Sequence, residues 1–270
     1  HSFPTRRSSD LSWWLVKEFA PNAKGSGIPQ VMAAVELANP KEHRKIRNLL
    51  SIKIIFFKIL SSVILVIGGG AVGREGPTIQ IAGSVFRKVN EYLPEWWPKI
   101  SKKNMIMTGA AAGLAAAFNT PLGGIVFAVE ELSKTHINYF KTALFTAVII
   151  AGLTAQTLAG SYLYLGYPKT NDVSLMVMLP IILVAATAGI MASQLSVTML
   201  KINSWKKKKL KTDKANVIFL VICALIIASI AYFINREVLG SGKEIMERVL
   251  FTKDKHEDWY VPILRMLGPA

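Results

Sequence analysis

The sequence predicts an all-α integral membrane protein that spans the bilayer several times and contains broken and re-entrant helices. The chain of 270 residues is 51% hydrophobic and only 18% charged, whereas soluble domains carry about a quarter charged residues. Its charged residues gather between long apolar segments, which is typical of membrane proteins. Three apolar stretches are interrupted by glycine and proline, and we interpret them as helices that break within the membrane.

Five segments are long and apolar enough to be spans, because a helix needs about 20 apolar residues to cross a bilayer. They are residues 49–72, 105–129, 140–167, 174–200 and 216–234. The last, NVIFLVICALIIASIAYFI, contains no charged residue. A large soluble protein with buried helices is the alternative, but it explains several uncharged runs of this length poorly.

The two ends of the chain differ from the rest. The first ten residues, HSFPTRRSSD, do not fit the remainder of the sequence and lack the apolar core of a signal peptide. We set residues 1–10 aside as a leader that is foreign to the native protein. The chain then begins abruptly and stops beside another apolar stretch, so we expect an architecture that is truncated at both ends.

The net charge of +15 raises the question of nucleic-acid binding, but its distribution argues against it. Residues 201–214, KINSWKKKKLKTDK, hold seven lysines against one aspartate and lie between apolar segments. Basic loops between spans stay in the cytoplasm, so we expect a basic cytoplasmic loop here and no nucleic acid as partner. Cys223 is the only cysteine and the four histidines are scattered, which predicts no metal site and no cofactor.

The first interrupted stretch is GSGIP at residues 25–29, followed by the helix-like QVMAAVELA. Proline is favoured in the first turn of a helix, where no partner is needed for the N–H group that it lacks. The free N–H groups and the positive dipole at a helix start attract anions, and Ser26 adds a hydroxyl just ahead. Two interpretations stay open: an anion site, or an ordinary serine N-cap after a glycine-rich turn.

The second stretch is GREGPT at residues 73–78, which comes directly after an apolar run. Pro77 again indicates a helix start and places Glu75 and Gly76 at its boundary. An ionised Glu75 would occupy the helix terminus and compete with an anion, and a protonated Glu75 could leave. A surface N-cap glutamate is the alternative, but the apolar and glycine neighbours favour a functional carboxylate.

The same region satisfies the dinucleotide-binding fingerprint through Gly68, Gly70 and Gly73. That fingerprint requires a strand before it and an uninterrupted helix after it. Here Pro77 comes soon after the last glycine, and residues 87–104 are polar and contain no second strand. We therefore expect neither a nucleotide enzyme nor any other enzyme.

The third stretch is TGAAAGLAAAFNTPLGGIVFAVEEL at residues 108–132. Gly109 and Gly113 form a G-x-x-x-G pattern, which allows close helix approach. Residues 119–121, NTP, break the helix, and the next helix ends in the pair Glu130–Glu131. Because carboxylates at a helix C-terminus oppose the dipole, either this pair is solvated at the membrane edge or one member is a proton relay.

Together, GSGIP, GREGPT and GLAAAFNTPLGGIVFAVEE resemble, in order and spacing, the signatures of the CLC family of chloride channels and chloride/proton antiporters. The resemblance is strong over residues 15–135. It continues weakly through VLGSGKEI at residues 238–245, which is similar to the family's glycine-rich segment early in its second repeat. The resemblance implies the CLC-type inverted-repeat architecture, with most of the first repeat in residues 11–200 and the start of an incomplete second repeat in residues 215–270.

The resemblance also implies roles for individual residues. It assigns chloride binding to two triplets, Gly25, Ser26, Gly27 and Arg74, Glu75, Gly76. In this assignment Ser26 supplies the hydroxyl for the central chloride, and Glu75 is the gating glutamate that alternates with chloride and takes up protons. Glu131 matches the internal glutamate through which antiporters pass protons. Many channels of the family carry an apolar residue there, so Glu131 favours an antiporter over a voltage-gated channel.

Two parts of the family's central site, a G-x-F-x-P loop and a late tyrosine, do not occur in this sequence. Truncation is the more economical explanation, but a membrane scaffold that does not transport stays open as an alternative. The partners that the resemblance implies are chloride, protons, the lipid bilayer and a second copy in a homodimer. The implied location is the cell (plasma) membrane.

Overall fold

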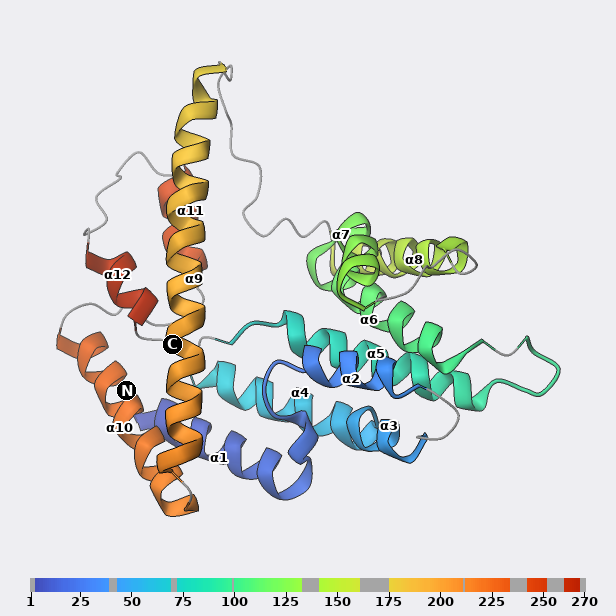
Figure 1. Ribbon diagram of the computed structural model, residues 1–270, viewed down its shortest axis with the longest axis horizontal. Helices are drawn as coiled ribbons and strands as arrows, with labels where there is room; N and C mark the ends of the chain where they lie inside the picture. The colour runs from blue at the N-terminus through green and yellow to red at the C-terminus, as the bar shows by residue number, and fades with distance from the viewer. Residues whose placement is uncertain are drawn as a thin grey trace. The chain divides into compact units, whose positions relative to one another are not determined.

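The structure is a computed structural model that describes residues 3–38, 43–68, 72–98, 100–132, 141–160, 175–210, 212–233, 242–251 and 260–267. Every regular element in these ranges is helical, which confirms the predicted all-α class (Figure 1). The chain forms two compact units, the first ending at Gly166 and the second beginning at Tyr167. Residues 174–200, which the family resemblance assigns to the first repeat, lie in the second unit, and the repeat boundaries stay a prediction.

The first unit is built around one central helix. Its helices are α1 (Phe3–Phe19), the 3-10 turn η1 (Pro21–Ala23), α2 (Ile28–Glu36), α3 (His43–Leu49), α4 (Ile52–Ile67), α5 (Glu75–Tyr92), α6 (Lys102–Phe118), α7 (Pro121–Phe127), the π-helical turn η2 (Ala128–Leu132) and α8 (Lys141–Ala159). Helix α6 contacts α2, α5, α7, η2 and α8. The region set aside as a leader is helical from Phe3 onward.

Close approach of α5 and α6 depends on the two glycines of the G-x-x-x-G pattern. A Cβ atom on Gly113 would lie 2.6 Å from the Cβ of Ala82 and 2.9 Å from the carbonyl oxygen of Thr78. A Cβ atom on Gly109 would lie 2.6 Å from that of Phe86. Real side chains do not fit at such distances, so the expectation of close helix packing at this pattern is confirmed.

Two apolar clusters hold the unit together on either side of α6. One joins α2, α5 and α6 through buried residues that include Val31, Ile79 and Ile106. The other joins α6, η2 and α8 through Ala111, Ala128 and Val148. The helices that begin at GSGIP and GREGPT therefore meet α6 and Leu132 in the first of these clusters.

Three helices in the described ranges are long and apolar enough to cross a membrane: Lys45–Ile67, Thr142–Ala159 and Leu175–Lys209. Ala215–Ile230 is a shorter apolar helical stretch that overlaps the segment predicted at 216–234. The segment predicted at 105–129 is divided between α6 and α7. Asn119 ends α6 in the left-handed conformation, with φ of 53°, and α7 begins at Pro121. The NTP sequence predicts this break correctly.

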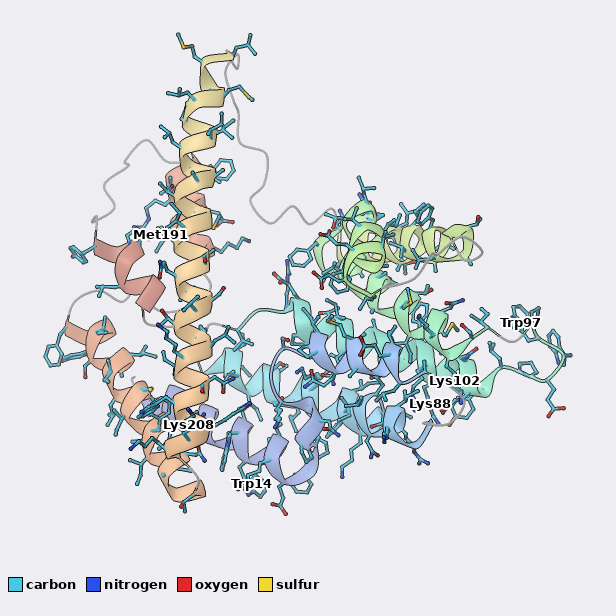
Figure 2. All side chains as sticks on the ribbon, viewed as in Figure 1. Trp14, Lys88, Trp97, Lys102, Met191 and Lys208 are labelled. Carbon is cyan, nitrogen blue, oxygen red and sulfur yellow. The ribbon has the colours of Figure 1, made fainter. Side chains whose placement is uncertain are left out.

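The second unit contains η3 (Leu175–Val177), α9 (Met178–Lys209), α10 (Asp213–Phe233), α11 (Lys243–Phe251) and α12 (Tyr260–Leu267). Within this unit the apolar side chains of α9 point outward, and 51% of Met191 is exposed (Figure 2). An apolar helix with no buried side chain in the described structure is suited to a lipid environment.

Helix α9 also corrects one expectation about the basic segment. We expected a loop at 201–214, but the helix continues to Lys209 and α10 begins at Asp213. Lysine is a good helix former, and cations in the last turn are stabilised by the negative end of the helix dipole. Of the weak resemblance at 238–245, residues 238–241 lie outside the described residues, and residues 243–245 belong to the first turn of α11.

Candidate site at the starts of helices α2 and α5

The first predicted anion-binding stretch forms the start of α2. Gly27 is the N-cap in the left-handed conformation, with φ of 104°, and Pro29 lies in the first turn as predicted. Ser26 lies one residue before this N-cap. The alternative, in which Ser26 itself is the N-cap residue, is therefore wrong. Its hydroxyl oxygen accepts a long hydrogen bond of 3.4 Å from the N–H of Ile28. Both Gly25 and Ser26 are exposed in this unit.

The second stretch forms the start of α5. Arg74 is the N-cap, Glu75 is the first helical residue and Pro77 lies in the first turn, which confirms the predicted helix start. The Glu75 side chain is exposed and Gly76 is buried. Helix α4, rather than a strand, leads into the glycines that precede this turn. The dinucleotide-binding alternative is therefore excluded by the structure.

These two helix starts touch each other. A Cβ atom on Gly76 would lie 2.8 Å from the Cβ of Ser26, and one on Gly27 would lie 2.9 Å from the carbonyl oxygen of Gly76. Only glycine at both positions lets the two turns meet. The positive ends of two helix dipoles thus come together, and an anion near them would offset their mutual repulsion.

Lys58 on α4 supports this arrangement, although the motifs of the sequence did not point to it. The side chain is buried, with 2% exposed, and its ammonium donates hydrogen bonds of 2.8 Å to the carbonyl of Ala23 and 2.6 Å to that of Gly25. A trans peptide directs its C=O and N–H groups in opposite directions. Since the structure contains no cis bond in its described part, the N–H of Ser26 points away from Lys58.

The signal for Lys58 is present in the sequence. It is an isolated cation within the apolar run IIFFKILSS, and ionisable residues in spans are functional candidates by default. Its two partners lie 35 and 33 residues earlier in the chain. This separation is why the spacing of residues within the run does not reveal what the lysine contacts.

Gln80 joins α5 to the segments that precede α2 and α4. The side chain is fully buried, and its Nε2 donates to the carbonyl oxygens of Asn22 at 3.1 Å and Leu49 at 3.2 Å. Its Oε1 is close to Gly27, since a Cβ atom on that glycine would lie 2.7 Å from it. Gln80 therefore helps to fix the distance between the two helix starts.

Arg74 lies beside a cavity of about 300 Å³ between the start of α5, the end of α6 and the end of α8. The guanidinium lies over the ring of Phe118, 5.5 Å from its centroid. Thr78, Asn119 and Gln156 supply polar groups to the same cavity. A polar cavity thus adjoins the first turn of α5.

Glu131 lies in η2, which contacts α2 and α6. Glu130 and Glu131 are exposed, and their neighbour Leu132 is buried in the same cluster as Val31 of α2. The structure therefore brings Glu131 to the same helix group, and in the described ranges no hydrogen bond joins it to Ser26 or Glu75. This described range stops at Leu132, so the predicted helix end at the glutamate pair stays a prediction.

Apolar spans, a helix broken at Asn119 and two helix starts that meet at glycines define the class of this protein. It is an integral membrane protein built partly from broken helices, which in such proteins line ion or substrate sites. The chain belongs to the voltage-gated chloride channel family, whose model matches residues 9–267.

Two comparisons agree with this membership. Over 155 residues, or 56% of the chain, the sequence is 37% identical to the H(+)/Cl(-) exchange transporter ClcA of Cronobacter sakazakii (strain ATCC BAA-894). The chain spans 31% of that relative's length. The fold of the present chain is similar to the fold in the crystal structure of a CLC-type fluoride/proton antiporter, with a TM-score of 0.76 and 16% sequence identity. That similarity covers 98% of this chain and 63% of the antiporter chain.

Proposed function

We propose that this chain forms part of a membrane protein that exchanges chloride for protons. The observation that carries the proposal is the meeting of the α2 and α5 starts at Ser26 and Gly76. Two positive helix ends held together by glycines can bind an anion through backbone N–H groups and helix dipoles, without a charged side chain at the contact. The exchange activity in the name of the similar ClcA transporter supports the same conclusion.

In this proposal the first helix start holds the anion. The Ser26 hydroxyl donates to chloride, and the backbone near Gly25 and Gly27 lines the path. Lys58 keeps the carbonyl of Gly25 turned away from the anion by donating a hydrogen bond to it. Carbonyl oxygens would repel chloride, so this orientation favours binding.

The second helix start holds both an anion and its competitor. The backbone of Arg74, Glu75 and Gly76 forms the outer anion site, and the carboxylate of Glu75 is the gate. The positive end of the α5 dipole stabilises the ionised carboxylate of Glu75, as it stabilises chloride. Protonation removes that attraction, so the side chain leaves and chloride enters. Proton uptake is thereby linked to the admission of an anion.

Glu131 is the proposed internal proton relay. Its exposure in η2 gives it access to protons, and its turn packs against α2, the helix of the central anion site. The proposal requires only chloride and protons and no cofactor, and the protein acts as a transporter rather than an enzyme. We further propose a homodimer in the plasma membrane, as the family resemblance implies.

The test uses the full-length protein that contains this chain, reconstituted in liposomes. An imposed chloride gradient should drive proton movement in the opposite sense, measured with a pH-sensitive dye inside the vesicles. Chloride flux without proton movement would identify a channel instead. Absence of both fluxes from well-folded protein would favour the scaffold alternative.

A further inference from the structure

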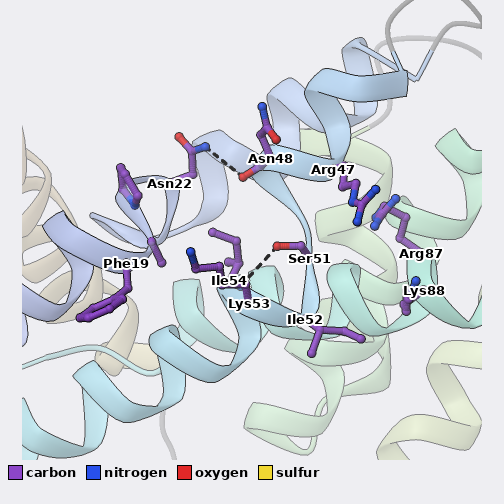
Figure 3. Close-up of a pocket in the computed structure, with 12 residues that line it drawn as sticks. Phe19, Asn22, Arg47, Asn48, Ser51, Ile52, Lys53, Ile54, Arg87 and Lys88 are labelled. Atoms are coloured by element: carbon purple, nitrogen blue, oxygen red, sulfur yellow. Dashed lines mark hydrogen bonds between the residues drawn. The ribbon is translucent and has the colours of Figure 1, made fainter.

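A second cavity in the first unit is strongly basic. It has a volume of about 420 Å³ and lies between the end of α1, η1, the junction of α3 and α4, and α5 (Figure 3). Four cationic side chains line it: Arg47, Lys53, Arg87 and Lys88. None of the residues proposed to bind chloride or protons lines this cavity.

The positive charge in this basic cavity is only partly neutralised. Arg87 and Lys88 both bond to the carboxylate of Glu91, so one anionic group serves two cations. The hydrogen bond to Glu91 raises the pKa of Lys88, which keeps it charged at neutral pH. Arg47 and Lys53 add two more cations, and Figure 3 shows the Arg47 and Arg87 side chains pointing toward one another. An anion between them would offset their repulsion.

Arg87 also has an unused donor. The residue is buried, with 6% exposed, and its Nε has no hydrogen-bond partner within the described residues. Buried donors without partners destabilise a fold by about 1–3 kcal/mol each. The hydroxyl group of Ser51 is a second available donor in the cavity. Its oxygen accepts a hydrogen bond from the N–H of Ile54, and its hydrogen is free to donate to a ligand.

The basic cavity lies at the beginning of a membrane span. Residues 47–48 and 51–54 line it, and the span Lys45–Ile67 starts there. The end of a span is at the depth of lipid headgroups, and basic pockets between helices at that depth suit anionic headgroups.

An apolar stripe runs along α4 away from this cavity. Its members are exposed and recur every three or four residues, which places them on one helix face: Ile52, Phe56, Ile59, Val63 and Val66. Ile52 belongs to both the stripe and the lining of the cavity. The surface thus continues from a cationic pocket to an apolar track, which matches a molecule with an anionic head and an apolar tail.

We propose that the basic cavity binds the phosphate headgroup of an anionic phospholipid, whose acyl chains lie along the α4 stripe. Phosphate oxygens accept paired hydrogen bonds from guanidinium groups. Free phosphate offers the same head chemistry but would leave the stripe unused, and one chloride would fill little of this volume. The proposal does not depend on the transported ion or on proton coupling.

The test measures lipid retention by the full-length protein. The protein is incubated with equal amounts of phosphatidylglycerol and phosphatidylcholine in detergent, and bound lipid is counted by native mass spectrometry. We expect the parent protein to retain phosphatidylglycerol preferentially. The double variant Arg47→Gln/Lys53→Gln should lose that preference by about thirtyfold, because two charge interactions with the headgroup are removed and each contributes about 1 kcal/mol. Both residues are exposed, so the fold should persist.

The matched control removes two lysines elsewhere. Lys102→Gln/Lys103→Gln at the start of α6 has the same change in net charge, and neither residue lines the basic cavity. It should leave the preference within about twofold, and the swap Arg47→Lys/Lys53→Arg should retain it. An equal loss in the control, or no loss in the cavity variant, would overturn the proposal. If inorganic phosphate raised the melting temperature of the protein and no preference for phosphatidylglycerol were found, the ligand of the cavity would be a free anion rather than a lipid.

Discussion

At the scale of single residues, Lys58 links a membrane span to the backbone of the proposed anion site. Its ammonium is buried and satisfied by the carbonyl oxygens of Ala23 and Gly25. Hydrogen bonds from charged groups are stronger than neutral ones. The lysine therefore fixes the orientation of the peptide before Ser26.

The variant Lys58→Met tests this role. It leaves two carbonyl oxygens without their donor, so we expect a loss of about 1–3 kcal/mol in stability together with weaker chloride binding. Thermal unfolding in detergent and calorimetric chloride titration measure the two effects. Lys53→Met, an exposed lysine of the same helix, should change stability by less than about 0.5 kcal/mol. Equal effects at both positions would contradict the assigned role.

Glu75 provides the second residue-level prediction. Glu75→Gln keeps the size of the side chain but removes its charge and its proton exchange. We expect chloride flux to continue and chloride-driven proton movement to fall to the level of empty liposomes. Persistent proton coupling in this variant would refute the gate assignment.

Glu131 and Glu130 form a matched pair for the proton relay. They are adjacent, exposed and of the same residue type. Glu131→Gln should reduce proton movement by about a hundredfold or more, the scale of a lost proton-transfer group, with chloride flux retained. Glu130→Gln should leave both fluxes near those of the parent protein. The reverse outcome would move the relay to Glu130.

At the scale of helices, the α5–α6 pair tests the packing argument. Gly113→Ala places a methyl group within 2.6 Å of Ala82, and overpacking of this kind destabilises by about 1–3 kcal/mol. Gly83→Ala is the control in the same pair, because its nearest neighbour would be 3.7 Å away. We expect a lower melting temperature for the first variant only. Similar melting temperatures would show that the helices separate easily.

Helix starts were the most predictable elements. Pro29, Pro77 and Pro121 each lie in the first turn of a helix, as predicted, because proline fixes its own backbone angle and needs no N–H partner there. The basic segment after residue 200 was less predictable. Its charge indicated a loop, but a long helix continues through it to Lys209.

At the scale of the whole molecule, the membrane topology stays a prediction. The lysine-rich end of α9 should be cytoplasmic. In a cysteine-free background, which within these 270 residues requires only Cys223→Ser, Lys207→Cys should resist an impermeant maleimide added to intact cells. It should react once the cells are permeabilised. Labelling in intact cells would reverse the orientation.

Sequence alone determined the all-α membrane class, the family resemblance, the three helix starts and the residues expected at the anion site. These features follow from local backbone chemistry and from apolar length, both of which are properties of short segments. Tertiary structure alone decided that Ser26 touches Gly76, that Lys58 binds the turn before Ser26 and that Arg47 and Arg87 share a cavity. Such contacts join positions far apart in the chain, and their partners are selected by how whole helices pack rather than by any local pattern.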